Sequence, residues 1–446
     1  MKLFCLDNGG GTCKYSLSHN NVTVVEDTVP NCCGRMNKQV QVLVADQVGA
    51  VKNGSSLSYI RPIDRGYLVN WGTEIEIWQR ILEKSKTKVE DIDCLILSEP
   101  IMNPSEFQND YNEMIFEEFN FNAYSRRPSA WYSAYETIYN NIFSSSTSVS
   151  SSSSSSKTKN NNNNNNSNNN DFGIIIDSGF SFTHSIPYCN GKIVANGVRR
   201  VDIGGKLLTN YLKEMVSYRQ WNMMDEFKLM DQVKEELCFV CTNFVDDMKS
   251  YQRVYGPGRQ RQVNYPLNQT TIGPKLRKSF ILPDFITTMR GYVASEDYEL
   301  KSEDQVLAME TERFTVPELI FSPSDVGMNQ AGLTDAVWDG ISNLSLSRQA
   351  LCFNNITLTG GNVLFPYFKL RFENELRSLM PDIIDLNVND LINNPQYYCL
   401  NGMKRFSNDL NNGKKQLSIE AVTKNEYLEH GHDRINHKLR SLAYCN

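Results

Sequence analysis

The chain has 446 residues, of which 40% are hydrophobic and 11% aromatic, so it is long enough for two or more domains with substantial cores. A net charge of −6 excludes a general attraction to nucleic acids or anionic membranes. The sequence contains no apolar run near the roughly 20 residues that a membrane-spanning helix requires. Its 11 cysteines are scattered over the whole length, which predicts reduced thiols, as in cytosolic or nuclear proteins, rather than a disulfide framework.

Three short apolar strands are each followed by a glycine turn. In chain order they are 3–6 with Asp-Asn-Gly-Gly-Gly at 7–11, 174–176 with Asp-Ser-Gly at 177–179, and 356–359 with Gly-Gly at 360–361. Asp-x-Gly at the end of a strand points consecutive amides into a concavity that suits a phosphate. A carboxylate beside those amides repels phosphate unless a cation lies between them. Asp7 and Asp177 therefore imply a Mg²⁺ ion held mostly through water.

The remaining elements alternate between strands and helices. Strands at 13–18 and 182–187 are predicted to return as hairpin partners after the first two turns, and 95–97 reads as a buried strand. Apolar spacing predicts helices at 71–82, 109–119, 131–143, 204–215, 231–247, 368–380 and 425–442. In the first helix, Ile75, Trp78 and Leu82 share one face. The pattern is that of a mixed α/β protein with two sheets.

One segment, 144–171, breaks the globular pattern because it is almost entirely Ser and Asn. Such a composition cannot bury enough apolar surface to order itself, which predicts a disordered surface insertion. A role in binding a partner is the alternative.

The sequence contains neither of two common phosphate-binding motifs, the P-loop and the dinucleotide-binding fingerprint. Gly205-Lys206 is followed by Leu207, not by the Ser or Thr of a P-loop, and Lys14 stands where the dinucleotide fingerprint needs its third glycine.

The chain resembles the actin superfamily over most of its length. The resemblance rests on the glycine turns and on six runs at 7–14, 70–71, 99–104, 114–119, 234–240 and 312–324. It excludes the Ser/Asn tract and roughly 249–283. Within the superfamily, the chain is similar to nuclear actin-related proteins at 66–71, 177–189, 201–210, 217–220 and 282–285.

The resemblance implies an α/β, actin-like two-lobed fold in which duplicated ribonuclease-H-like domains face each other over a nucleotide cleft. The first lobe would span 1–143, with a shortened subdomain 2 at about 30–62, and 399–446 would complete it. The second lobe would span 172–398, with subdomain 4 at about 204–328. The low-complexity tract at 144–171 would join the two lobes.

The resemblance also implies a site for ATP or ADP with Mg²⁺. The binding residues it implies are Asp7, Gly9, Gly11 and Lys14 in the first turn, Asp177 and Gly179 in the second, and Gly204, Lys234, Glu235, Gly360, Gly361 and Phe365 farther along the chain. Asp7 and Asp177 would hold the metal through water, and Lys14 would pair with phosphate as a point charge. An empty, purely structural cleft is the alternative.

Three departures from the family pattern affect hydrolysis. Gly10 stands where actins carry a serine whose hydroxyl donates to the terminal phosphate, and Ser129 stands where they carry the glutamine that orients the attacking water. Phe180 replaces a second carboxylate after Asp-Ser-Gly. Losing one preorganised polar group typically lowers a rate by on the order of 10²–10³. We therefore expect nucleotide binding without efficient turnover, and no catalytic residues.

The function that the resemblance implies is that of a non-catalytic subunit of a nuclear ATP-dependent chromatin-remodelling complex of the Swr type, which exchanges a histone variant. Its partners would be a Snf2-type ATPase, other subunits of the complex and the nucleosome, with DNA contacted indirectly. The stretch between Gly34 and Asp46 is too short for the loop that joins actin subunits, so no filament is expected. The alternatives are an ATP-hydrolysing actin-like enzyme and a cytoplasmic cytoskeletal relative, and the expected location is the nucleus, with the cytoplasm as alternative.

Other candidate sites have simpler interpretations. Cys238-x-x-Cys241 lacks a second cysteine pair at zinc-ribbon spacing, so buried thiols on a helix explain it better than zinc. His430, His432 and His437 are interpreted as exposed side chains of the terminal helix. Residues 249–279 carry seven basic and no acidic residues. Basic residues interleaved with tyrosines can contact phosphate backbones, although a solvated loop is the simpler interpretation.

Overall fold

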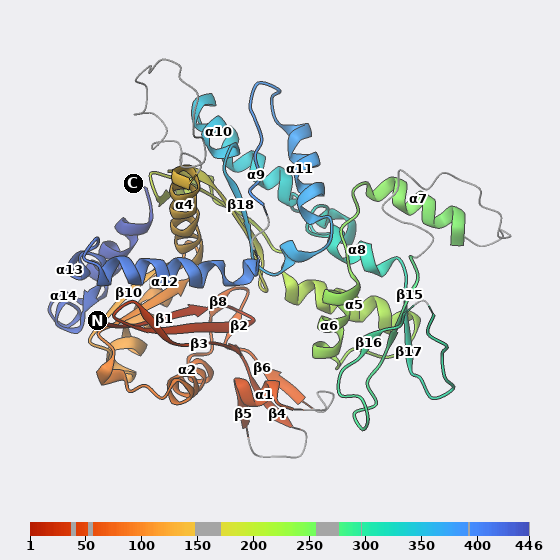
Figure 1. Cartoon of the computed structure of the whole chain (residues 1–446), viewed down its shortest axis with the longest axis horizontal. Coiled ribbons are helices and arrows are strands. Elements are labelled where there is room, and N and C mark those ends of the chain that lie inside the picture. The colour runs from red at the N-terminus through yellow and green to blue at the C-terminus, as the bar shows by residue number, and fades with distance from the viewer. Residues whose placement is uncertain are drawn as a thin grey trace.

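The computed structural model describes residues 1–36, 42–51, 57–147, 171–255, 276–295, 297–390 and 393–445. Most of the predicted Ser/Asn tract and residues 256–275 of the basic segment lie outside these ranges. The described chain is α/β and forms two lobes (Figure 1). Each lobe is built around one main sheet, and smaller sheets flank both.

The first lobe contains a six-stranded sheet in the order β19-β10-β9-β1-β2-β3. Its strands are β1 (Lys2–Asn8), β2 (Thr12–His19), β3 (Val22–Pro30), β9 (Cys94–Glu99), β10 (Ala123–Pro128) and β19 (Val422–Thr423). Strands β1 and β2 form the predicted antiparallel hairpin, and β9 lies parallel to β1. The first glycine turn connects the two strands of the hairpin.

The second lobe repeats this arrangement. Its main sheet consists of β11 (Phe172–Ser178), β12 (Thr183–Cys189), β13 (Lys192–Ile193), β14 (Arg199–Val201) and β18 (Ile356–Thr359). Strands β11 and β12 form an antiparallel hairpin, and β18 lies parallel to β11. Asp7 pairs in register with Lys14 in the first lobe, and Asp177 pairs with His184 in the second. The two glycine turns are therefore equivalent parts of a duplicated unit.

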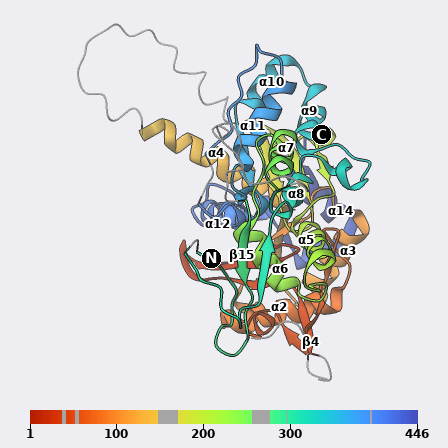
Figure 2. The same ribbon diagram turned by 90° about the vertical axis from the view of Figure 1, so that its right-hand side faces the viewer.

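Helices from both ends of the chain cover the first sheet. They are α2 (Trp71–Ser85), η1 (Val89–Asp91), α3 (Ser105–Glu113), the π-helical turn η2 (Met114–Glu118), α4 (Ser129–Thr147), α12 (Tyr398–Asn411), α13 (Leu417–Glu420) and α14 (Lys424–Ala443). Helix α12 crosses α4 so closely that a Cβ at Gly402 would lie 2.0 Å from the Tyr132 carbonyl oxygen. This close packing attaches the C-terminal segment to the first lobe, and Figure 2 shows the far end of α4 projecting from the body.

A smaller unit extends the first lobe towards the second. It contains β4 (Cys33–Met36), β5 (Val42–Val44), α1 (Asp46–Gly49), β6 (Leu57–Ile60), β7 (Ile63–Asp64) and β8 (Tyr67–Leu68). Strands β5, β4 and β6 form a three-stranded sheet with its own small apolar core around Cys32, Val48 and Leu57. This unit includes most of the stretch at about 30–62 that was predicted as subdomain 2 and continues to Leu68.

The second lobe is completed by further helices, most of which share one core with its sheet. These are η3 (Ala195–Gly197), α5 (Gly205–Arg219), α6 (Phe227–Leu237), α7 (Phe244–Tyr255), α8 (Glu312–Glu318), η4 (Pro323–Val326), α9 (Leu333–Ser342), α10 (Leu346–Phe353), η5 (Asn362–Leu364), α11 (Phe368–Leu379) and η6 (Pro395–Tyr397). Strands β15 (Lys278–Ile281), β16 (Tyr292–Val293) and β17 (Val306–Met309) form a separate sheet at its far end.

Several predicted elements need correction. The single helix predicted over 231–247 is wrong, because α6 ends at Leu237 and α7 begins at Phe244. Cys238 is therefore extended rather than helical. The helix predicted to begin at 109 begins at Ser105. Helix α4 continues to Thr147, into the first residues of the predicted insertion.

The cysteine and membrane predictions can also be compared with the structure. All 11 cysteines are free thiols, and both Cys238 and Cys241 are buried. Among the described residues, no three His, Cys, Asp or Glu side chains gather in a way that could hold a metal ion. The described helices likewise include none that is long and apolar enough to span a membrane.

Candidate functional site

A cavity of about 680 Å³ lies between the two lobes at the glycine turns. Of the residues predicted to bind nucleotide, those that line it are Asp7, Gly9, Gly11, Lys14, Asp177, Gly179, Lys234, Glu235, Gly360, Gly361 and Phe365. Gly204 is the exception. A Cβ there would lie 2.4 Å from the Ser181 carbonyl carbon, so Gly204 packs behind the second turn and the prediction that it binds ligand needs correction.

In the first turn, the side chains of Asp7 and Lys14 form an ion pair. Lys14 Nζ lies 3.1 Å from Asp7 Oδ2, and the Ser98 hydroxyl donates to Asp7 Oδ1 at 2.9 Å. Burial by itself lowers the pKa of Lys14, but the neighbouring Asp7 carboxylate raises it above its ordinary value. Lys14 therefore stays charged at the floor of the cavity. The Asn31 amide braces the turn by donating to the Gly9 carbonyl at 3.0 Å.

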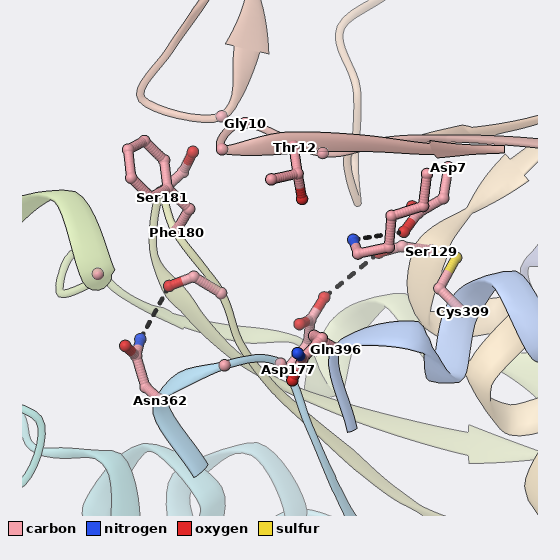
Figure 3. Close-up of a pocket in the computed structure, with 18 of the residues that line it drawn as sticks. Asp7, Gly10, Thr12, Ser129, Asp177, Phe180, Ser181, Asn362, Gln396 and Cys399 are labelled. Carbon is pink, nitrogen blue, oxygen red and sulfur yellow. Dashed lines mark hydrogen bonds and ion pairs between the residues drawn. The ribbon is translucent and has the colours of Figure 1, made fainter. Parts of the chain in front are cut away.

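In the second turn, Asp177 accepts a hydrogen bond from the Ser129 hydroxyl at 3.3 Å (Figure 3). Burial, aided by the negative charge of Asp7, raises the pKa of Asp177 to about 6. His184 lies opposite Asp177 on β12, and burial together with Arg200 lowers its pKa to about 3. In the second turn the residue opposite the aspartate is thus a neutral histidine, whereas in the first turn it is a charged lysine that pairs with the aspartate.

The backbone amides of the two turns are hydrogen-bond donors that a ligand in the cavity could use. The amides of Gly10, Gly11, Phe180 and Ser181 donate to no partner in the part of the chain that the structure describes. The Asn362 side chain fixes the second turn by donating to the Gly179 carbonyl at 2.8 Å. Unpaired amides from two facing turns suit an anionic ligand such as a phosphate chain.

Asp7 and Asp177 also meet the requirements of a Mg²⁺ site. Both carboxyl groups face the same cavity, and the charge of Asp7 contributes to the raised pKa of Asp177. A cation between them would relieve this repulsion. Oxygen ligands held partly through water are those that Mg²⁺ prefers beside phosphates. The residues present therefore fit the metal that the sequence predicts.

The far end of the cavity is formed by the third turn and by α6. Gly360 has φ +92°, and a Cβ there would lie 2.1 Å from the Ser178 carbonyl oxygen, so only glycine fits. Gly361 faces open space, and Phe365 is almost fully buried beside it. Lys234 is not a free cation, because its ammonium donates to Asp231 Oδ1 at 2.6 Å and to the Thr209 hydroxyl at 2.9 Å.

Phe180 belongs to a cluster of aromatic side chains that joins the lobes. The Arg61 guanidinium carbon lies 4.7 Å from the centre of the Phe180 ring, 5.0 Å from Phe227 and 5.7 Å from Tyr59. Arg61 and Tyr59 come from the first lobe, whereas Phe180 and Phe227 come from the second. Arginine over aromatic faces contributes about 0.5–2 kcal/mol per contact. Phe180 thus packs between the lobes at the position where the resemblance to actins leads us to expect a carboxylate.

Sequence reasoning missed several lining residues. Ser98, Ser181, His184, Asn362 and Cys399 all line the cavity, and none of them was predicted to bind. His184 follows Asp177 by seven residues, as Lys14 follows Asp7, so the duplication itself could have identified it. Ser181 gives no such signal, because its importance depends on a turn that lies far away in the sequence.

Comparisons with known proteins agree with this architecture. The family model described as "Actin" matches residues 1–440. The chain is 32% identical to Actin-related protein 6 of Drosophila melanogaster, over 97% of this chain and 98% of that protein. It is 34% identical to Actin-related protein 6 of Oryza sativa subsp. indica, over 84% and 86% of the two chains. It is 28% identical to the Dictyostelium discoideum protein of the same name, over 98% of this chain and 94% of that protein.

The chain therefore belongs to the actin family. The relatives named here, with which it aligns over most of their length, are actin-related proteins.

Proposed function

We propose that this protein binds ATP or ADP with Mg²⁺ without efficient hydrolysis and serves as a structural subunit of a nuclear chromatin-remodelling complex. The observation that carries the first part is the donor set of the two turns, where unpaired amides and the charged Lys14 face one cavity. Asp7 and Asp177 would hold the Mg²⁺ ion, which would neutralise part of the phosphate charge. Bound nucleotide would stabilise the closed lobes by mass action.

The positions that would activate water support weak turnover. Ser129 lies at the start of α4 and donates to Asp177, so its short side chain is already engaged. The Phe180 side chain has no hydrogen-bonding atom and packs against Arg61. Each lost polar group is expected to lower the rate by on the order of 10²–10³. Nucleotide would then act as a ligand that stabilises the fold rather than as a substrate.

We expect the purified protein to bind one Mg-ATP or Mg-ADP and to show little multiple turnover. The Lys14→Met variant should bind ATP at least about tenfold more weakly, because it removes an ionic contact to phosphate. Isothermal titration calorimetry with both nucleotides, together with a phosphate-release assay, measures both properties. Lys206→Met is the control, since Lys206 pairs at 3.3 Å with an exposed Asp64 outside the cavity. Rapid steady turnover by the native chain would favour the enzymatic alternative.

The chromatin role rests on family membership and on the resemblance to nuclear actin-related proteins. We expect affinity purification of the tagged protein from cell extract to recover a large Snf2-type ATPase and histone-exchange subunits, identified by mass spectrometry. Nuclear location of the tagged protein is the matching observation in cells. Recovery of cytoskeletal proteins alone, or sedimentation of the protein as polymer, would contradict this proposal and favour the cytoskeletal alternative.

A further inference from the structure

The two phosphate turns approach each other most closely between Gly10 and Ser181. A Cβ added at Gly10 would lie 2.4 Å from Ser181 Oγ and 3.7 Å from Ser181 Cβ. Figure 3 shows the Ser181 side chain beside the Gly10 turn, with the two residues coming from opposite lobes. Any side chain at position 10 would therefore compete with the Ser181 hydroxyl for the same space.

This overlap relates Ser181 to the serine that actins carry in the first turn. A serine hydroxyl oxygen is one covalent bond away from its own Cβ. A serine at position 10 would therefore place its Cβ against Ser181 Oγ and its hydroxyl within one bond length of that contact. The first turn thus carries no hydroxyl at position 10, and the second turn brings one next to that position.

The Ser181 hydroxyl is available to a ligand. Ser181 is half-buried and lines the cavity. Within the described residues its hydroxyl has no hydrogen-bond partner, unlike that of Ser178, which pairs with Thr183 at 2.8 Å. The free amides of Phe180 and Ser181 lie on the same turn. Together these groups present three donors from one short segment.

We propose that Ser181 donates its hydroxyl hydrogen bond to the terminal phosphate of ATP, replacing from the second turn the donor that Gly10 cannot supply. This inference rests on the proposed nucleotide binding and adds a residue that makes the site prefer ATP to ADP. It also explains why position 10 is glycine, because any larger residue would displace the hydroxyl. In this arrangement the terminal phosphate still receives a hydrogen bond from a serine hydroxyl, but that serine lies in the second turn and not in the first.

The test compares ATP and ADP binding by calorimetry in the native chain and three variants. Ser181→Ala should lower ATP affinity about tenfold and leave ADP affinity unchanged, as expected for losing one hydrogen bond to a charged group. Gly10→Ser alone should also bind ATP more weakly, because its Cβ overlaps Ser181 Oγ. The double variant Gly10→Ser/Ser181→Gly should recover the ATP affinity of the native chain, since it moves the hydroxyl back to the first turn.

Ser185→Ala is the matched control, because Ser185 lies buried on β12 and does not line the cavity. Thermal melting of each variant separates loss of binding from loss of folding. If the native chain binds neither nucleotide, the proposed function itself is wrong. If it binds both and Ser181→Ala changes neither affinity, or lowers both equally, only the assignment of Ser181 to the terminal phosphate is overturned.

Discussion

The Glu74→Gln variant is expected to be more stable than the native chain at pH 8 by about 3 kcal/mol, and no more stable at pH 4. The reason is a carboxyl group buried beneath the first phosphate turn. Glu74 is completely buried on α2, and its Oε2 atom has no hydrogen-bond partner among the described residues. Its other oxygen accepts from Trp78 Nε1 at 3.1 Å.

Burial raises the pKa of Glu74 from its ordinary 4.5 to about 7, although the polar side chains of Asn8, Trp78 and Asn31 beside it oppose the shift. The folded chain therefore holds this proton more tightly than the unfolded chain. The resulting stabilisation is complete below about pH 4.5 and is lost as the pH rises through about 7. At pH 8 the native chain buries a charge, whereas a glutamine at this position stays neutral.

A glutamine also suits the neighbouring groups. Asn31 Oδ1 is buried without a partner among the described residues, and the Asn31 side chain lies beside the Glu74 carboxyl group. The amide of the substituted glutamine can donate to this oxygen while its carbonyl still accepts from Trp78. Melting temperatures at pH 4 and pH 8 measure the effect. Glu83→Gln on the same helix is the control, because its side chain is 69% exposed. Equal differences at both pH values would show that Glu74 is not the titrating group.

A second large effect is expected at Arg371, in the core of the second lobe. The Arg371→Met variant should lose about 3–5 kcal/mol of stability, because it leaves Glu318 as a buried charge without its main partner. Arg371 on α11 contacts Glu318 on α8 at 2.7 and 3.2 Å, and it donates to the Cys241 carbonyl at 2.6 Å. The side chains of Arg371 and Glu318 are only 8% and 2% exposed.

A double-mutant cycle isolates this pair. Replacing both members, as in Arg371→Met/Glu318→Leu, should recover most of the lost stability, because an apolar pair avoids burying charge altogether. Lys369→Met on the same helix is the control, since its partner Asp390 is fully exposed and surface pairs contribute about 0–1 kcal/mol. Denaturant unfolding followed by tryptophan fluorescence is measured for the native chain, the two single variants Arg371→Met and Glu318→Leu, the double variant and the control. Additive losses in the double variant would contradict a coupled buried pair.

The sequence predicts those parts of the fold that depend on short stretches of chain. Both hairpins, their glycine turns and the helix at 368–380 are confirmed, because each is specified by a local run of apolar residues and a turn. The helix predicted over 231–247 fails because distant segments bind its middle. The Phe239 amide donates to the Arg313 carbonyl at 2.9 Å, and the Val240 amide donates to the Pro366 carbonyl at 3.0 Å. Such tertiary bonds have no local signal.

The buried face of α2 is a second feature that the sequence pattern alone does not predict correctly. Its apolar spacing predicts a face with Ile75, Trp78 and Leu82, but the side chains that are buried are Glu74, Ile77, Trp78, Ile81 and Ser85. A glutamate in the core can be predicted only once Trp78 and Asn31 are known to surround it. The candidate site, too, could be predicted only in part. The two aspartates and the glycines follow from the turn pattern, whereas the meeting of Gly10 with Ser181 requires both lobes to be in place.

The route of the chain through the first lobe has a consequence for synthesis on the ribosome. Five of the six strands of its sheet are made by residue 128, but β19 and the covering helices α12 and α14 come only after residue 397. The main elements of the second lobe, by contrast, all lie between residues 172 and 397. The lobe that emerges first is therefore finished last, and until α12 arrives, the apolar residues it covers stay exposed on the nascent chain, as surface that chaperones can hold.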